Sequence, residues 1–151
     1  MNGFWNKRYL QSDGATTVEF AIVLPLLLTL IFGAIEFSLY LYNRQVLTNA
    51  CREAARTGVI MRMRTDPTAT TAEEEIVKNK FNAILSSVPL VTFGSAGPPS
   101  PQIAFDLGAD NRINFGDNLT VQADYTYDFL FLANLGIGPI TIHAFSKMKM
   151  E

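Results

Sequence analysis

The stretch GATTVEFAIVLP, residues 14–25, opens the most apolar part of the 151-residue chain and decides how the chain is organised. Glu19 lies near its start, and no charged residue occurs between Glu19 and Glu36. An α-helix would separate Ala15 from Glu36 by roughly 32 Å, at about 1.5 Å per residue. Because that distance is close to the hydrocarbon thickness of a bilayer, we predict a transmembrane helix over residues 15–42, in which Glu19 needs an explanation.

The near end of this helix does not resemble a secretory signal peptide. Such a peptide has small residues at a cleavage site after its apolar run, whereas Gly14 and Ala15 stand before the run. Cleavage between them would leave the apolar helix at the new N-terminus, so the helix would remain in the mature protein.

At the far end of the helix, the sequence predicts a membrane interface. Glu36 is expected to be hydrated there, and Tyr40 and Tyr42 follow it as the aromatic residues of an interfacial belt do. Gly33 and Ala34 either allow close helix packing in a filament or are ordinary in a transmembrane helix. The sequence does not decide between these two interpretations.

The order of features from residue 14 to residue 58 resembles the TadE-like family, whose members are pilin-like proteins of the Tad (Flp) pilus machinery. A short polar leader ends at Gly14, Glu19 is the fifth residue after it, and the aromatic Phe20 follows. Pro25 inside the helix and the segment VLTNACREAAR, residues 46–56, complete the resemblance. The rest of the chain matches no motif.

This resemblance implies the processing and the partners of a prepilin. A dedicated prepilin peptidase would cleave between Gly14 and Ala15, with Phe20 in its recognition motif, and would remove the leader, residues 1–14. Glu19 would then pair with the ammonium group of Ala15 in a neighbouring subunit. The implied partners are the membrane, the peptidase, other pilin or pseudopilin subunits and pilus assembly proteins, and the implied processes are cell adhesion and secretion.

Two interpretations of Glu19 remain open. A charged side chain at the centre of a membrane helix costs about 2.5 to 3.5 kcal/mol on insertion scales, so a charge partner in the next subunit would favour assembly. In the other interpretation, Glu19 lies in the cytoplasmic headgroup region and is hydrated.

The distribution of basic residues gives a contrary signal about topology. Positive residues favour the cytoplasmic side, and the leader's Lys7 and Arg8 are outnumbered by arginines after the helix: Arg44, Arg52, Arg56, Arg62 and Arg64. We nevertheless expect a cytoplasmic N-terminus and an extracytoplasmic C-terminal domain at the bacterial inner membrane. The implied peptidase acts on the cytoplasmic side, and downstream domains are often translocated despite their charge. The inverted topology is the alternative.

Residues 43–64 are expected to continue the helix outside the membrane. Small and apolar residues recur on one helical face: Val46, Leu47, Ala50, Cys51, Ala54 and Gly58. Ala50, Ala54 and Gly58 make this face thin, so another element can pack closely against it. Charged and polar residues lie off this face, among them Glu53 and Arg56, and form either a solvated surface or an intersubunit salt-bridge site.

Residues 65–151 are predicted to form a small α+β globular domain. The spacing of apolar residues in 72–88 predicts an amphipathic helix. Alternation with a period of two then predicts three or four antiparallel strands, near residues 103–107, 113–115, 119–129 and 140–146. Between the last two, the segment FLFLANLGIGP, residues 129–139, is apolar without alternation. We expect it to fold into the core; the alternative is an exposed patch for another pilus component.

Nothing in the sequence indicates catalysis, a metal or a cofactor. Cys51 is the only cysteine, which excludes an internal disulfide and a cysteine-based metal site; it is expected to pack as a small apolar residue. The only histidine, His143, lies in an alternating strand and is interpreted as structural. Acidic and amide residues near Asp110 and Asp117 lack the EF-hand spacing and suit turns. The net charge of −2 does not suggest nucleic acid as a partner.

These features predict an α+β fold in which a long N-terminal helix, half transmembrane and half amphipathic, packs on a small antiparallel sheet with a second helix. The predicted function is that of a minor pilin or pseudopilin, a non-enzymatic component taking part in assembly of a Tad (Flp) type IV pilus. The alternative is a single-pass membrane-anchored extracytoplasmic binding domain that never assembles and keeps its leader.

Overall fold

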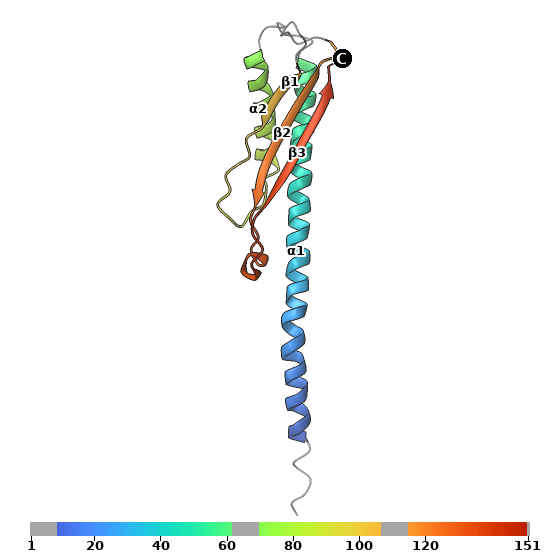
Figure 1. Ribbon diagram of the computed structural model, residues 1–151, viewed down its shortest axis with the longest axis vertical. Helices are drawn as coiled ribbons and strands as arrows, with labels where there is room; N and C mark the ends of the chain where they lie inside the picture. Colours follow the sequence, from blue (N-terminus) through green and yellow to red (C-terminus); the bar gives the residue numbers. More distant parts are fainter. Residues whose placement is uncertain (1–8, 62–69, 107–114, 151) are drawn as a thin grey trace, which may run out of the picture.

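A computed structural model describes residues 9–61, 70–106 and 115–150 as an α+β fold built along one long helix (Figure 1). The helices are α1 (Tyr9–Met61), α2 (Thr70–Ser87) and a short 3-10 helix, η2 (Leu132–Leu135). The strands are β1 (Gln102–Asp106), β2 (Asn118–Tyr127) and β3 (Ile140–Lys149), and they form one antiparallel sheet in the order β1-β2-β3. The predicted fold class is confirmed.

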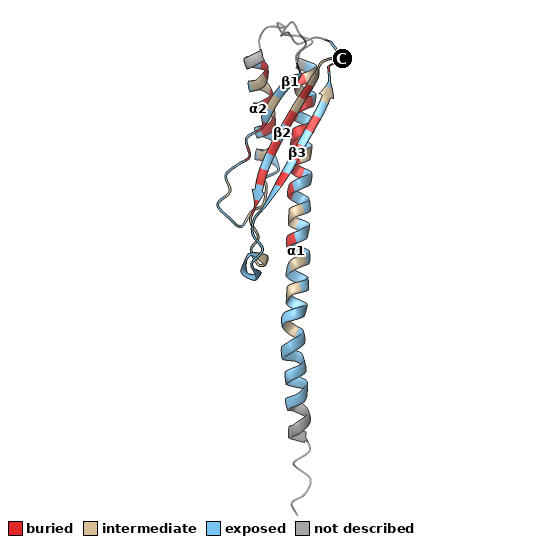
Figure 2. Cartoon of the chain, in the orientation of Figure 1, coloured by how far each residue is buried: buried red, intermediate tan, exposed pale blue. Residues whose placement is uncertain are grey.

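The two halves of α1 have different surroundings. The helix has 53 residues, a length of about 80 Å, and it passes Pro25 without interruption. Its C-terminal half lies against α2 and the sheet, whereas its N-terminal half extends away from them (Figure 1). Burial follows this division, because the buried positions of α1 lie between Glu36 and Gly58, in its C-terminal half (Figure 2).

The core lies between α1 and one face of the sheet. Successive side chains of a strand point to opposite faces, so alternate residues of β2 and β3 are buried: Leu119, Val121, Ala123, Tyr125 and Tyr127, with Ile142, Ala144 and Ser146. From α2, Val77 and Phe81 join the same core. The amphipathic helix and the alternating strands of the sequence therefore meet on the inner side of the sheet.

Asn43 fixes the segment after α2 to α1. Its amide nitrogen donates to the carbonyl oxygen of Val91 at 2.6 Å, and its amide oxygen accepts from the Val91 N–H at 2.8 Å. One helical position earlier, the Tyr42 hydroxyl donates to the carbonyl oxygen of Pro89 at 3.3 Å. The chain is thereby returned to the middle of α1 before it enters β1.

The connection between β2 and β3 does not fold into the core, so that prediction was wrong. Leu130, Leu135 and Ile137 are 58%, 55% and 43% exposed. The physical reason is the path of the hairpin, which carries residues 128–139 beyond the end of the sheet to a place beside the middle of α1 (Figure 1). No second layer of this chain's described residues covers the connection there.

A strand was predicted near residues 113–115, and Phe115, the one of these residues that the structure describes, is not in a strand. Residues 113 and 114 lie outside the described part of the chain, and Phe115 belongs to a turn. Gly116 in that turn has a φ of 95°, a conformation that favours glycine. Its N–H donates to the carbonyl oxygen of Met150 at 2.9 Å, which fixes the turn at the end of β3.

Candidate functional site

The N-terminal half of α1 presents a continuous apolar surface. Among residues 14–60, α1 is long and apolar enough to cross a membrane, and the stretch that meets this test has no buried residue. Large side chains are exposed all around it, including Val18, Phe20, Ile22, Leu26, Leu30, Phe37 and Leu41. An apolar surface of this size in water would be strongly unfavourable, so α1 is a candidate membrane anchor.

The bond between Gly14 and Ala15 lies inside α1, which begins at Tyr9. A Cβ atom built on Gly14 would meet no described atom within 4 Å, and the same holds for Gly33. Glycine in a helix interior is less favourable than alanine by about 1 kcal/mol. Packing within the described chain therefore gives no reason for glycine at either position.

Glu19 and Phe20 are both exposed, and Phe20 is 63% exposed. Within the described residues, no hydrogen bond or ion pair engages the Glu19 carboxylate. Ala15 and Glu19 are four residues apart in α1, which places them on the same face of the helix. The carboxylate is therefore available to a group outside this chain or to a charge created at residue 15.

Glu36 is buried, which contradicts the expectation of a hydrated interfacial side chain. It is only 3% exposed. Its Oε1 atom accepts from the backbone N–H of Phe131 at 2.5 Å, and its Oε2 atom accepts from that of Leu132 at 3.0 Å. The connection between β2 and β3, and not water, thus satisfies the carboxylate.

Aromatic rings surround the Glu36 contact. Phe131 stacks on Phe32 of α1 with 4.9 Å between ring centroids. On the other side of Glu36, Tyr40 meets Tyr127 edge-on at 6.4 Å, and Tyr127 meets Phe129 edge-on at 5.2 Å. The connection is therefore held to α1 by two charge-assisted hydrogen bonds between stacked rings.

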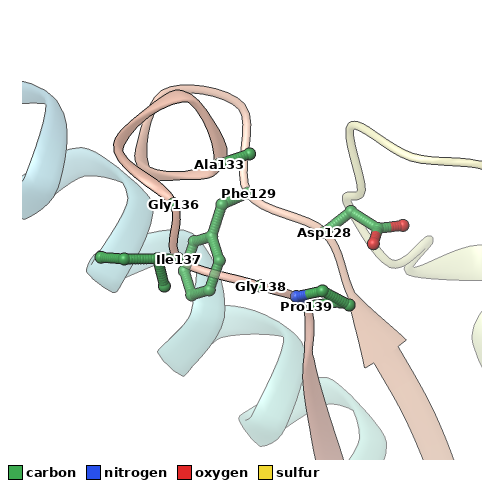
Figure 3. Close-up of a pocket in the computed structure, with 7 residues that line it drawn as sticks. All are labelled: Asp128, Phe129, Ala133, Gly136, Ile137, Gly138 and Pro139. Carbon is green, nitrogen blue, oxygen red and sulfur yellow. The ribbon is translucent and has the colours of Figure 1, made fainter.

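The connection closes on itself around a small hollow of about 290 Å³, lined by Asp128, Phe129, Ala133, Gly136, Ile137, Gly138 and Pro139. Phe129 and Ile137 both line the hollow on the side of α1, while the Asp128 carboxylate points away from the helix (Figure 3). The lining has one charged side chain, so the hollow offers no polar constellation for catalysis.

The thin face of α1 packs under the sheet. Ala50 and Ala54 have no exposed surface. A Cβ atom on Gly58 would lie 2.5 Å from Cδ2 of Leu119 and 2.8 Å from Cγ2 of Val77. At Gly58, any side chain would therefore require Leu119 of β2 and Val77 of α2 to shift. Beside this face, Glu53 lies 3.9 Å from Lys80 Nζ of α2, which makes it part of an exposed pair within the chain.

Reactive side chains are few in the described structure. Burial raises the pKa of the Cys51 thiol to about 11, and its Sγ lies 3.8 Å from the carbonyl oxygen of Ala144. His143 is exposed, with Nδ1 2.7 Å from Oδ1 of Asp124. No group of three potential metal ligands occurs among the described residues, and Asp110 lies outside them.

Two features of this region escaped the sequence analysis. Asn43 was not recognised, because an asparagine at the end of an apolar helix also suits a solvated position. The partner of Glu36 was missed because the contact joins residues 95 positions apart. The available signal was the apolar run without alternation at 129–139, which is too long for a turn and lacks the period of a strand.

Comparison with known proteins identifies the N-terminal segment. The family model described as TadE-like protein matches residues 14–56, less than a third of the chain. The resemblance seen in the sequence is thereby confirmed over these residues, which include the exposed apolar part of α1 and its junction with the sheet. The match associates the chain with the Tad pilus system. No curated protein and no solved structure matches.

Proposed function

We propose that this protein, with its TadE-like segment at residues 14–56, is a minor pilin or pseudopilin that takes part in assembly of a Tad (Flp) type IV pilus. The observation that carries the proposal is the coincidence of the family match with the exposed apolar part of α1. In this proposal the role of the subunit is structural and non-enzymatic. The sheet and α2, which fold beside α1, form its extracytoplasmic surface. Its partners are the membrane, other pilin or pseudopilin subunits and assembly proteins.

Processing by a prepilin peptidase gives Gly14 a role that packing does not. Among the described residues, no neighbour within 4 Å limits a side chain at this position, so we infer that the requirement for glycine comes from another molecule. Cleavage after Gly14 makes Ala15 the N-terminus of the mature chain. Because the bond lies inside α1, the peptidase has to unwind the first turns of the helix, and glycine lowers the free energy needed for this.

Cleavage also gives Glu19 a charge partner. The new ammonium group at Ala15 and the carboxylate at Glu19 lie near the same end of the membrane helix. Pairing between subunits removes two charges from contact with lipid at once, and unpaired charges there are unfavourable. Glu19 thereby couples maturation to assembly, because the pairing exists only after the leader has been removed.

The proposed topology follows from the same steps. The N-terminus faces the cytoplasm of a bacterial cell, α1 crosses the inner membrane, and the sheet and α2 lie on the extracytoplasmic side. This orientation places the arginines after the helix on the extracytoplasmic side, against the positive-inside rule. Such exceptions occur because long downstream domains are translocated largely regardless of their charge.

The test of the assembly role is substitution of Glu19 in the native host. Glu19→Gln keeps the size of the side chain and removes its charge. Glu19→Ala removes both the charge and the side chain beyond Cβ. Both variants should insert and lose their leader, and both should co-purify less with other pilus subunits. Glu75→Gln, the same change at an exposed residue of α2, is the matched control and should behave as wild type.

The outcomes separate the competing interpretations. If both Glu19 variants are cleaved and co-purify at the wild-type level, Glu19 is a hydrated headgroup residue and the assembly role is wrong. If wild-type protein keeps its leader and co-purifies with no pilus subunit, the alternative of a membrane-anchored binding domain is correct.

A further inference from the structure

The connection between β2 and β3, which we call the apolar loop (residues 128–139), lies beside the membrane-spanning part of α1. Its contacts with α1 are to Phe32 and Glu36. Val18 lies near the other end of the exposed apolar surface. It precedes Glu36 by 18 residues, which correspond to about 27 Å along the helix. A hydrocarbon core is about 30 Å thick, so a membrane that begins at Val18 reaches the level of Glu36.

The exposed apolar surface of α1 continues beyond the loop contact. Phe37 and Leu41 are 60% and 43% exposed on the sheet side of Glu36. The apolar loop is therefore placed within the length of α1 that favours lipid.

The composition of the loop fits the same environment. No Asp, Glu, Lys or Arg occurs from residue 129 to residue 146. Part of its apolar surface faces outward, with Leu130 58% and Leu135 55% exposed. Asp128 stands at the entrance of the loop and points away from α1 (Figure 3), as expected for a residue that remains in water.

The backbone of the loop is also prepared for a nonpolar environment. In lipid, a backbone N–H without an acceptor is strongly unfavourable. Glu36 accepts from the N–H groups of Phe131 and Leu132. The N–H groups of Asn134, Gly136 and Ile137 find acceptors inside the loop, each at 3.1 Å, and Pro139 has no N–H. Five N–H groups of the loop therefore have acceptors that do not depend on water.

We propose that the apolar loop inserts into the extracytoplasmic leaflet beside α1 and is a second membrane-contacting element of the subunit. Glu36 is its positioning residue. The inference rests on the proposed membrane placement of α1. Interfacial elements of other proteins bury their apolar side about 5–10 Å into the headgroup and acyl boundary, and the loop is long enough to do so while the sheet remains in water.

Membrane fractionation does not test this inference, because α1 alone retains the protein in the membrane. The test is a fluorescent probe at single cysteines in the full chain, with Cys51→Ala as background, reconstituted in lipid vesicles at about one copy per vesicle. Leu135→Cys reports on the loop, Leu26→Cys on α1 and Gln122→Cys on the exposed outer face of the sheet. Brominated acyl chains and aqueous iodide are the two quenchers.

The inference predicts that the probe at residue 135 behaves like that at residue 26. Brominated lipid should quench both, and both should be shielded from iodide, while the probe at residue 122 shows the reverse. Adding Glu36→Ala should reduce lipid quenching at residue 135 and leave that at residue 26 unchanged.

Three results would overturn the inference. Quenching at residue 135 by iodide alone, with residue 26 in lipid, would place the loop in water and leave the proposed anchor intact. Shielding of residue 135 from both quenchers would mean that other parts of the same chain, and not lipid, cover the loop. Iodide quenching at residue 26 would remove the membrane placement of α1 and the inference with it.

Discussion

The carboxylate of Glu36 and the backbone N–H of Phe131 meet at 2.5 Å, although the two residues are 95 positions apart in the chain. This contact joins α1 to the connection between the two long strands. Because the same carboxylate also accepts from Leu132, it acts as an external cap for the start of η2. Glu36 therefore determines where the apolar loop lies along α1.

Substitution of Glu36 should loosen the loop without unfolding the core. Hydrogen bonds to a charged group contribute about 1.5–3 kcal/mol, so Glu36→Ala should accelerate amide exchange at Phe131 and Leu132 by roughly 10- to 150-fold. Hydrogen exchange of the detergent-solubilised full chain measures this. Glu19→Ala, the same change at an exposed residue of α1, should leave exchange at these amides unchanged; equal exchange in both variants would contradict the positioning role.

The main elements could be predicted from the sequence because their signals are local. The apolar run of α1 and the alternation in β2 and β3 each depend on neighbours within a few positions. The place of residues 129–139 could not be predicted, because burial of a uniformly apolar segment depends on what else reaches it. Here the hairpin carries most of the segment past the sheet, where it lies beside α1.

The residues of the candidate site also differ in whether their signal in the sequence is local or long-range. Gly14, Ala15, Glu19 and Phe20 could be proposed from the sequence because their spacing is a linear motif. The burial of Glu36 could not be found from spacing, because a glutamate after an apolar run suits a hydrated interface as well as a long-range contact.

The two glycines of α1 should respond differently to the same change. Gly58→Ala places a Cβ atom against Leu119 and Val77 and should destabilise the folded part by about 1 to 3 kcal/mol, as overpacking typically does. Gly33→Ala meets open space and should raise stability by up to about 1 kcal/mol through helix propensity. Resistance of the full chain to protease in detergent compares them. Equal resistance of the two variants would show that α1 does not approach β2 as closely as described.

The thiol of Cys51 should be unreactive and should make stability sensitive to high pH. Burial raises its pKa from 9.0 to about 11, so the contribution of the neutral thiol is fully present below pH 9.0 and is lost as the pH rises through about 11. The loss is at most roughly 3 kcal/mol, from 1.36 kcal/mol per pKa unit. Denaturant titrations over this pH range should therefore show a steeper loss for wild type than for Cys51→Ala. Parallel losses would contradict burial of the thiol.

The hydroxyl of Tyr127 should contribute nothing favourable to folding. It is buried without a hydrogen-bond partner among the described residues, and burial, together with the negative charge of Glu36, raises its pKa. Tyr127→Phe keeps the edge-on contacts with Tyr40 and Phe129 and removes an unsatisfied group, whose burial costs about 1–3 kcal/mol. Its thermal midpoint should equal or exceed that of wild type. A lower midpoint would mean that the hydroxyl has a partner in the membrane-bound protein.

The intact mass of the mature protein, purified from its native membranes, tests the pilin assignment. The prediction is a chain that begins at Ala15 and lacks residues 1–14, and a Gly14→Leu variant that keeps them. Because a side chain at residue 14 meets no described atom within 4 Å, this variant should retain the wild-type fold and protease resistance. Its uncleaved leader would then reflect peptidase selectivity. A wild-type mass that still includes residues 1–14 would contradict the assignment.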